Sequence, residues 1–234
     1  MRCTRCGHEP NESDKFCAEC GMFLRDAWID QRLLLALAEE REGNDRDARR
    51  ALERLTEAEP DHALANHLLG NMYFHQGTLD LALERYRRAL ASAPRYLACH
   101  YDLGVALYHR GDMRAAAKAF QACLEIDPSY NAAHYRLALC LFHAGLLDDA
   151  LEHFERADTL TPEYVMSRYH VGIVHERRGD LERAAREFQR GLEESVDDAS
   201  SLYHLAKIRE AQGDARGAQE LLARAGQFGR VAAR

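Results

Sequence analysis

The sequence predicts an all-α protein that consists of six similar helix pairs, with a short cysteine-rich segment before them. The main observation is a glycine that recurs every 34 residues along the 234-residue chain. These glycines are Gly43, Gly77, Gly111, Gly145, Gly179 and Gly213. The second observation is that apolar residues between the glycines follow helical spacing. Self-similarity at a fixed period of roughly 20 to 50 residues indicates stacked copies of one supersecondary unit.

Two cysteine pairs open the chain. They read C-x-x-C, ten intervening residues and C-x-x-C, and a glycine follows each pair. Two residues between thiolates let one tight turn aim both sulfurs at a single point, and the glycine permits the positive φ that such a turn often needs. Four thiolates suit a tetrahedral Zn²⁺ in a closed structural site, with no open position for a substrate. The expected zinc ligands are Cys3, Cys6, Cys17 and Cys20.

The cysteine-rich segment resembles a short zinc ribbon, which we assign to residues 1–27. Iron is the main alternative metal, because soft thiolate sites also take iron. Two disulfides would need an oxidising compartment, and residues 1–6 lack the apolar core of an export signal. Residues 1–28 carry four basic and five acidic side chains. The segment therefore lacks the basic excess that nucleic-acid binding needs.

The rest of the chain keeps the 34-residue register without an insertion. Alanine recurs five residues after each glycine and a small residue lies seven residues before it. A proline lies two residues before the end of each of the first four repeats. The repeats, counted from Ile29, are 29–62, 63–96, 97–130, 131–164, 165–198 and 199–228. We assign residues 28–230 to this repeat domain.

Each 34-residue repeat is expected to contain two helices. Within residues 97–130, apolar side chains on both sides of Gly111 have the spacing of one helix face. Gly111 separates the helices, and Asp127 ends the second, because the residue before a proline avoids the α region. A small residue at the Gly104 position lets the paired helices approach closely, and the ring at the Phe120 position fills the space between them.

This pattern resembles the tetratricopeptide repeat (TPR), and the resemblance covers residue 29 to about residue 228. The resemblance implies a right-handed TPR α-solenoid of six helix-turn-helix repeats, in which the first helices line a concave groove. It also implies a role, because members of this family usually bind proteins or peptides and their repeats carry no catalytic machinery.

The residues at the ends of the repeats predict contacts between neighbouring repeats. The last residue is often aromatic or histidine, as at His62, Tyr96, Tyr130 and Tyr164. Counting back 34 residues from His62 leads to Trp28, so we expect Trp28 to dock the ribbon in the same way. Three further cysteines are expected to be buried thiols that act as small apolar fillers; they are Cys99, Cys123 and Cys140.

The TPR resemblance places exposed groove residues on the first helix of each repeat. Rigid aromatic side chains are favoured interface anchors, and pairs of an aromatic residue and a histidine occur in repeats two to four. The predicted partner-binding residues are Asn71, Phe74, His75, Tyr101, Tyr108, His109, Tyr135, Arg136, Phe142, His143, Tyr169 and His170. A second interpretation stays open, in which these Tyr and Phe side chains pack between neighbouring first helices.

The charges of the groove favour one kind of peptide over another. A TPR groove that clamps the carboxylate end of a chaperone tail would need hydrogen-bond donors where this register has Asp102 and Ala132. Asp102 would repel a carboxylate, and Ala132 offers no donor. A partly polar peptide is better suited by the mixed charges of this groove, which come from Asp102, Arg136, His170, His204 and Lys207.

Composition and motifs favour an interaction protein. The net charge of −7 argues against a nucleic-acid backbone as the principal partner. The longest apolar runs, 33–38 and 137–142, are far shorter than the ~18 residues of a membrane helix. No H-E-x-x-H, phosphate-binding glycine loop or nucleophile motif is present. We therefore predict a cytoplasmic, non-catalytic protein–protein interaction adaptor with a structural zinc ion. The alternative is a nucleic-acid-associated regulator that uses the ribbon.

Overall fold

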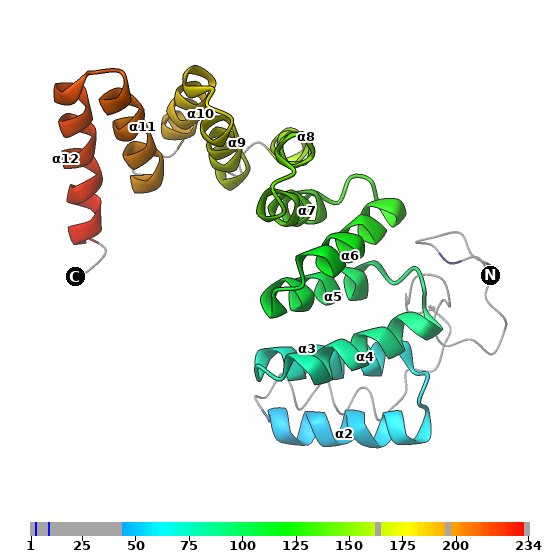
Figure 1. Ribbon diagram of the computed structural model, residues 1–234. Helices are drawn as coiled ribbons and strands as arrows, with labels where there is room; N and C mark the ends of the chain where they lie inside the picture. Colours follow the sequence, from blue (N-terminus) through cyan, green and yellow to red (C-terminus); the bar gives the residue numbers. More distant parts are fainter. Residues whose placement is uncertain (1–2, 4–8, 10–43, 162–164, 195–197, 232–234) are drawn as a thin grey trace. The chain divides into compact units, whose positions relative to one another are not determined.

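The computed structural model describes residues 3, 9, 44–161, 165–194 and 198–231. Every regular element within these ranges is an α-helix (Figure 1). The helices are α2 (Asp45–Ala58), α3 (Ala63–His75), α4 (Leu79–Ser92), α5 (Leu97–Arg110), α6 (Met113–Ile126), α7 (Asn131–His143), α8 (Leu147–Leu160), α9 (Val165–Arg177), α10 (Leu181–Glu194), α11 (Ala199–Ala211) and α12 (Ala215–Val231). The predicted helix-turn-helix repeats are confirmed over this part of the chain.

The chain divides into two compact units, residues 1–133 and 134–234, which we describe separately. In the first unit, each helix from α2 to α6 packs against the next helix along the chain. In the second unit, each helix from α8 to α12 does the same. Each unit therefore buries its core between sequential helices, as expected for stacked repeats.

The recurring glycines adopt a backbone conformation that other residues avoid. Their φ angles lie between +77° and +88° at Gly77, Gly111, Gly145, Gly179 and Gly213. The residue after each glycine donates its N–H to a carbonyl five residues earlier, as from Asp112 to Leu107 at 2.9 Å. This left-handed closure satisfies carbonyls at the end of the first helix. The 34-residue glycine period is thus a period of helix ends.

A second set of glycines lets the two helices of a repeat approach closely. A Cβ atom added to Gly104 would lie 2.6 Å from the Phe120 ring, and one added to Gly172 would lie 2.7 Å from the Phe188 ring. Both rings are fully buried. The predicted packing of an aromatic ring against a small residue is confirmed in these repeats.

The aromatic residues at the ends of the repeats contact side chains of their own repeat. Tyr96 is buried and its hydroxyl contacts His67, and the Tyr130 ring lies 5.4 Å from the Tyr101 ring. The predicted contact between neighbouring repeats stays a prediction at these positions. His62 differs, because its Nδ1 accepts a hydrogen bond from the Ala65 N–H and caps α3. Trp28 and Tyr164 lie outside the described residues.

The three scattered cysteines are buried free thiols, as predicted. Burial raises the pKa of Cys123 to about 12 and that of Cys140 to about 11, and it raises the pKa of Cys99 further. Thiols that remain protonated are poor nucleophiles and poor metal ligands. Their role is therefore packing.

Two glycine substitutions should separate backbone strain from crowding. Gly111→Ala should lower the free energy of unfolding by about 1–2 kcal/mol, because a Cβ disfavours the left-handed backbone conformation. Crowding does not contribute, since no atom lies within 4 Å of the added Cβ. Gly104→Ala should cost about 1–3 kcal/mol, because its Cβ collides with Phe120. Urea titrations measure both costs.

A second-site change provides the control for this pair. In a Phe120→Leu background, the additional cost of Gly104→Ala should shrink, whereas that of Gly111→Ala should stay the same. If both costs shrink equally, the assignment of one to crowding and the other to strain is wrong.

Candidate partner-binding surface

The first unit carries an aromatic cluster at the C-terminal ends of α3 and α5. The Phe74 ring meets His75 edge-on at 5.7 Å and His109 at 5.5 Å between ring centroids. Tyr108 lies 6.1 Å from His109 in the same manner. Both histidines are exposed, and Phe74 and Tyr108 are half-buried. These four residues, called the aromatic cluster below, offer apolar area with polar nitrogens beside it.

Two other predicted binding residues of this unit are partly engaged within the protein. Asn71 Oδ1 accepts a hydrogen bond from the Tyr86 hydroxyl at 2.8 Å. Tyr101 packs edge-on against Phe120 and Tyr130, with centroids 5.7 and 5.4 Å away. Both are half-buried, as are Phe74 and Tyr108, whereas the two histidines of the aromatic cluster are exposed.

A buried histidine links α3 to α5 through hydrogen bonds. His67 is only 6% exposed; its Nε2 lies 2.7 Å from Asp102 Oδ2, and its Nδ1 lies 2.8 Å from the Tyr96 hydroxyl. A carboxylate only accepts, so Nε2 carries the proton donated to Asp102, and Nδ1 makes the second hydrogen bond with the Tyr96 hydroxyl. Asp102, expected from the sequence to repel a carboxylate ligand, is thus already hydrogen-bonded to His67.

The second unit places a cation over a buried ring. Phe142 is 7% exposed, and the Arg177 guanidinium lies 4.0 Å from its ring centroid. Arg177 is itself exposed, as is His143 beside Phe142. A guanidinium on an aromatic face is attracted to the ring quadrupole. A partner would therefore meet the cation of Arg177 here rather than the Phe142 ring.

Three predicted residues of this unit pack between successive first helices. The Tyr135 hydroxyl lies 3.4 Å from His170 Nδ1, and the Tyr169 hydroxyl lies 3.2 Å from His204 Nε2. His170 also stacks on Phe154, with centroids 5.0 Å apart. These contacts match the packing interpretation that the sequence left open. Arg136, on α7, is half-buried.

Glu176 brings together two of the polar residues that the sequence places in the groove, His204 and Lys207. Its Oε2 accepts a hydrogen bond from His204 Nδ1 at 2.6 Å, and its Oε1 lies 3.7 Å from Lys207 Nζ. His204 Nδ1 carries the proton donated to the carboxylate, and Nε2 makes a second hydrogen bond with the Tyr169 hydroxyl. Tyr96, His67 and Asp102 of the first unit form a chain of the same three groups, with the roles of the two ring nitrogens exchanged.

A single sequence offset underlies these contacts. The contacting side chains are 35 residues apart in Phe74–His109, His67–Asp102, Tyr135–His170, Phe142–Arg177 and Tyr169–His204. The offset exceeds the 34-residue repeat length by one, because helical side chains point toward the N-terminus of their helix. A side chain therefore meets the residue one position further along in the neighbouring repeat. Pairing residues at this offset would have identified Arg177 as the neighbour of the predicted residue Phe142, whereas Glu176 meets His204 and Lys207 at other offsets.

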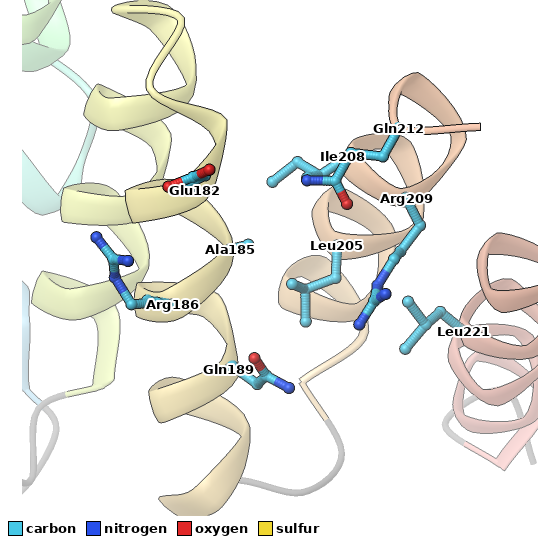
Figure 2. Close-up of a pocket in the computed structure, with 9 residues that line it drawn as sticks. All are labelled: Glu182, Ala185, Arg186, Gln189, Leu205, Ile208, Arg209, Gln212 and Leu221. Carbon is cyan, nitrogen blue, oxygen red and sulfur yellow. The ribbon is translucent and has the colours of Figure 1, made fainter. Parts of the chain in front are cut away.

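Figure 2 shows a pocket of about 300 Å³ between α10, α11 and α12. Leu205 and Ile208 of α11 and Leu221 of α12 contribute apolar surface to it, and the polar lining includes both charge signs. Arg209 occupies the position that Leu107 fills as a buried residue in the third repeat. Arg209 is exposed, lines the pocket and lies 3.5 Å from Asp214.

The predicted zinc ligands lie mostly outside the described residues. Cys3 is described and buried, whereas Cys6, Cys17 and Cys20 are outside the described ranges. Over the part of the chain that the structure describes, no three His, Cys, Asp or Glu side chains form a metal-binding group. In the same part of the chain, no helix combines the length and apolar character needed to cross a membrane.

These helix pairs and their turns define an α-helical repeat protein. The tetratricopeptide repeat family matches residues 33–96, 79–131, 101–165 and 171–232. The chain therefore belongs to the tetratricopeptide repeat family.

Solved structures agree with this fold. MamA is 23% identical over 72% of this chain and 92% of its own, with a TM-score of 0.68. PilF of Pseudomonas aeruginosa is 21% identical over 86% and 90%, with a TM-score of 0.69. YrrB, described as a TPR protein with an unusual peptide-binding site, is 20% identical over 76% and 92%, with a TM-score of 0.66. None of the curated protein sequences compared with this chain matches it.

Three histidines of the second unit make its stability depend on pH. Burial lowers the pKa of His153, His170 and His175 below the ordinary value of 6.5. The unfolded chain then binds more protons than the folded one below about pH 6.5, so stability is full above that pH and falls as the pH drops through the lowered pKa values. Each histidine contributes a slope of at most about 1.4 kcal/mol per pH unit.

We therefore expect the melting temperature to fall between about pH 7.5 and pH 5.5. Differential scanning calorimetry across this range measures the slope. His170→Gln should make the slope shallower, because it removes one of the three groups while keeping a donor for the Met166 carbonyl, which His170 Nδ1 contacts at 2.8 Å. A wild-type melting temperature that rises as the pH falls would contradict the direction of these pKa shifts.

Proposed function

We propose that this protein is a non-catalytic adaptor that binds a peptide segment of a protein partner along the first helices of its repeats. The aromatic cluster of Phe74, His75, Tyr108 and His109 is the observation that carries this proposal. It combines exposed histidines with half-buried rings on two neighbouring first helices. Tetratricopeptide repeat proteins are generally scaffolds for protein interactions, which supports the same role.

The side chains of the cluster indicate what the partner carries. The Phe74 and Tyr108 rings favour an apolar or proline side chain, and the exposed His75 and His109 nitrogens can hydrogen-bond to its backbone or polar groups. In the second unit, Arg177 and Lys207 are exposed and suit an acidic residue or a carbonyl. The proposed ligand is therefore a partly polar peptide with at least one bulky apolar side chain, and we place the adaptor in the cytoplasm.

Substitution of the aromatic cluster tests this proposal. Peptides are first selected on the whole protein from a random displayed library, and their affinities are then measured by calorimetry. Phe74→Ala combined with Tyr108→Ala should weaken binding at least about 30-fold, because buried aromatic anchors dominate interface energies. Leu81→Ala is the matched control, since Leu81 is 46% exposed on the second helix of the same repeat. Equal affinities for wild type and the double variant would refute the assignment.

We also propose that Cys3, Cys6, Cys17 and Cys20 hold one structural zinc ion. The proposal rests on the spacing of the four cysteines and on the suitability of four thiolates for tetrahedral Zn²⁺. Metal binding would supply the folding energy of a segment too short for a core of its own.

Metal analysis of desalted protein tests this second proposal. Wild type should retain one tightly held zinc per chain, and Cys17→Ser combined with Cys20→Ser should lose it. Cys140→Ala is the control, because that thiol is buried in the repeats and protonated. Iron in place of zinc would correct the metal, and an equal metal content in wild type and the double variant would reject the site.

A further inference from the structure

The guanidinium of Arg177 rests on a buried ring and has no acidic partner within the protein. It lies 4.0 Å from the ring centroid of Phe142, which is 7% exposed. Phe142 belongs to α7, whereas Arg177 is the last residue of α9 and is exposed. Over the described residues, Arg177 forms no ion pair with an Asp or Glu. Its positive charge is therefore held at the surface without being neutralised there.

The charged residues on either side of Arg177 in the sequence are already engaged. Arg178 pairs with Asp148, and its Nη1 lies 2.8 Å from the Asp148 Oδ1. Glu176 lies 2.6 Å from His204 Nδ1 and 3.7 Å from Lys207 Nζ, so its carboxylate is used by α11. The acid adjacent in sequence therefore does not neutralise Arg177.

The contact with Phe142 positions the guanidinium without using all of its hydrogen-bond donors. An aromatic face attracts the cation, but a guanidinium carries five N–H donors in one plane. The donors that do not meet the ring can bind a carboxylate, which a guanidinium holds with two parallel hydrogen bonds. Because the ring already restricts the side chain, less conformational entropy is lost when a ligand binds.

The equivalent contact in the first unit uses an imidazole. There the ring of Phe74 meets His109 with centroids 5.5 Å apart, and these two residues occupy the repeat positions of Phe142 and Arg177. A neutral imidazole both donates and accepts hydrogen bonds, whereas a guanidinium only donates and is always charged. The same repeat position therefore offers general hydrogen bonding in the first unit and a fixed positive charge in the second.

We infer that Arg177, held on the Phe142 ring, selects an acidic side chain in the peptide partner. The ligand is a peptide segment with an Asp or Glu whose carboxylate pairs with this guanidinium, since one guanidinium balances the charge of one carboxylate. Phe142 is a positioning residue, because it contacts Arg177 and the carboxylate does not touch it. This inference rests on the proposed peptide-binding function and specifies the chemistry that the second unit recognises.

A double-mutant cycle between protein and peptide tests the inference. The probe is a peptide selected on the whole protein from a random displayed library, made in its acidic form and in an amide form with Asn for Asp and Gln for Glu. Wild type should bind the acidic form at least about fivefold more tightly than the amide form in calorimetry. Arg177→Gln should bind the two forms equally and keep the wild-type affinity for the amide form. The wild-type preference should also shrink as the salt concentration rises.

Arg178→Gln is the matched control, because it removes the same charge one residue away from a side chain that Asp148 already engages. It should keep the preference for the acidic form. Phe142→Leu should reduce the preference and leave the affinity for the amide form unchanged. Its fold should tolerate the change, since the same repeat position holds Glu176 and Glu210 in the fifth and sixth repeats.

Three results would overturn the inference. They are selected peptides that lack Asp and Glu, an equal preference for the acidic form in wild type and Arg177→Gln, and an equal loss of preference in the Arg177 and Arg178 variants. Failure of the aromatic cluster gives a different result. If Phe74→Ala with Tyr108→Ala leaves the affinity unchanged while Arg177→Gln abolishes the preference, the cluster assignment is wrong and the role of Arg177 stands.

Discussion

In the second, third and fifth repeats, the close approach of the two helices depends on an aromatic ring that lies against a glycine. Phe120 against Gly104 and Phe188 against Gly172 show this contact directly. The rings are fully buried and supply the largest apolar side chains of the core. Because there is no room for a Cβ at these contacts, the sequence must keep glycine and an aromatic residue in register there. The fourth repeat pairs Ala138 with Phe154 at the same positions, and the sixth has Ala206 and Leu222.

Polar contacts join successive repeats once the helix pairs have formed. In each unit a tyrosine hydroxyl, a histidine and a carboxylate form a chain, as Tyr96–His67–Asp102 and Tyr169–His204–Glu176. Both ring nitrogens of these histidines are used, so a rotation of either ring would break two contacts. These histidines therefore hold neighbouring first helices in register, whereas the exposed His75 and His109 remain available to a partner.

Much of the fold could be predicted from the sequence, because its determinants are local. Gly111 and the four described glycines in the same register have to adopt positive φ, and proline ends second helices, whatever surrounds them. The surface was less predictable. Tyr135, Tyr169 and His170 were predicted to face a partner, but they pack between first helices. Whether an aromatic side chain meets solvent or the next helix depends on the residue 35 positions away in the neighbouring repeat.

The sequence by itself determined the repeat length, the helix pairs, the turns and the burial of the three scattered cysteines. Only the tertiary structure decided which polar side chains are partnered, because that depends on how neighbouring helices pack against each other. It placed Arg177 over Phe142, hydrogen-bonded Asp102 to His67, and brought His134 against His153. Periodicity specifies which face of a helix is buried, but the relative positions of helices specify which two side chains meet on that face.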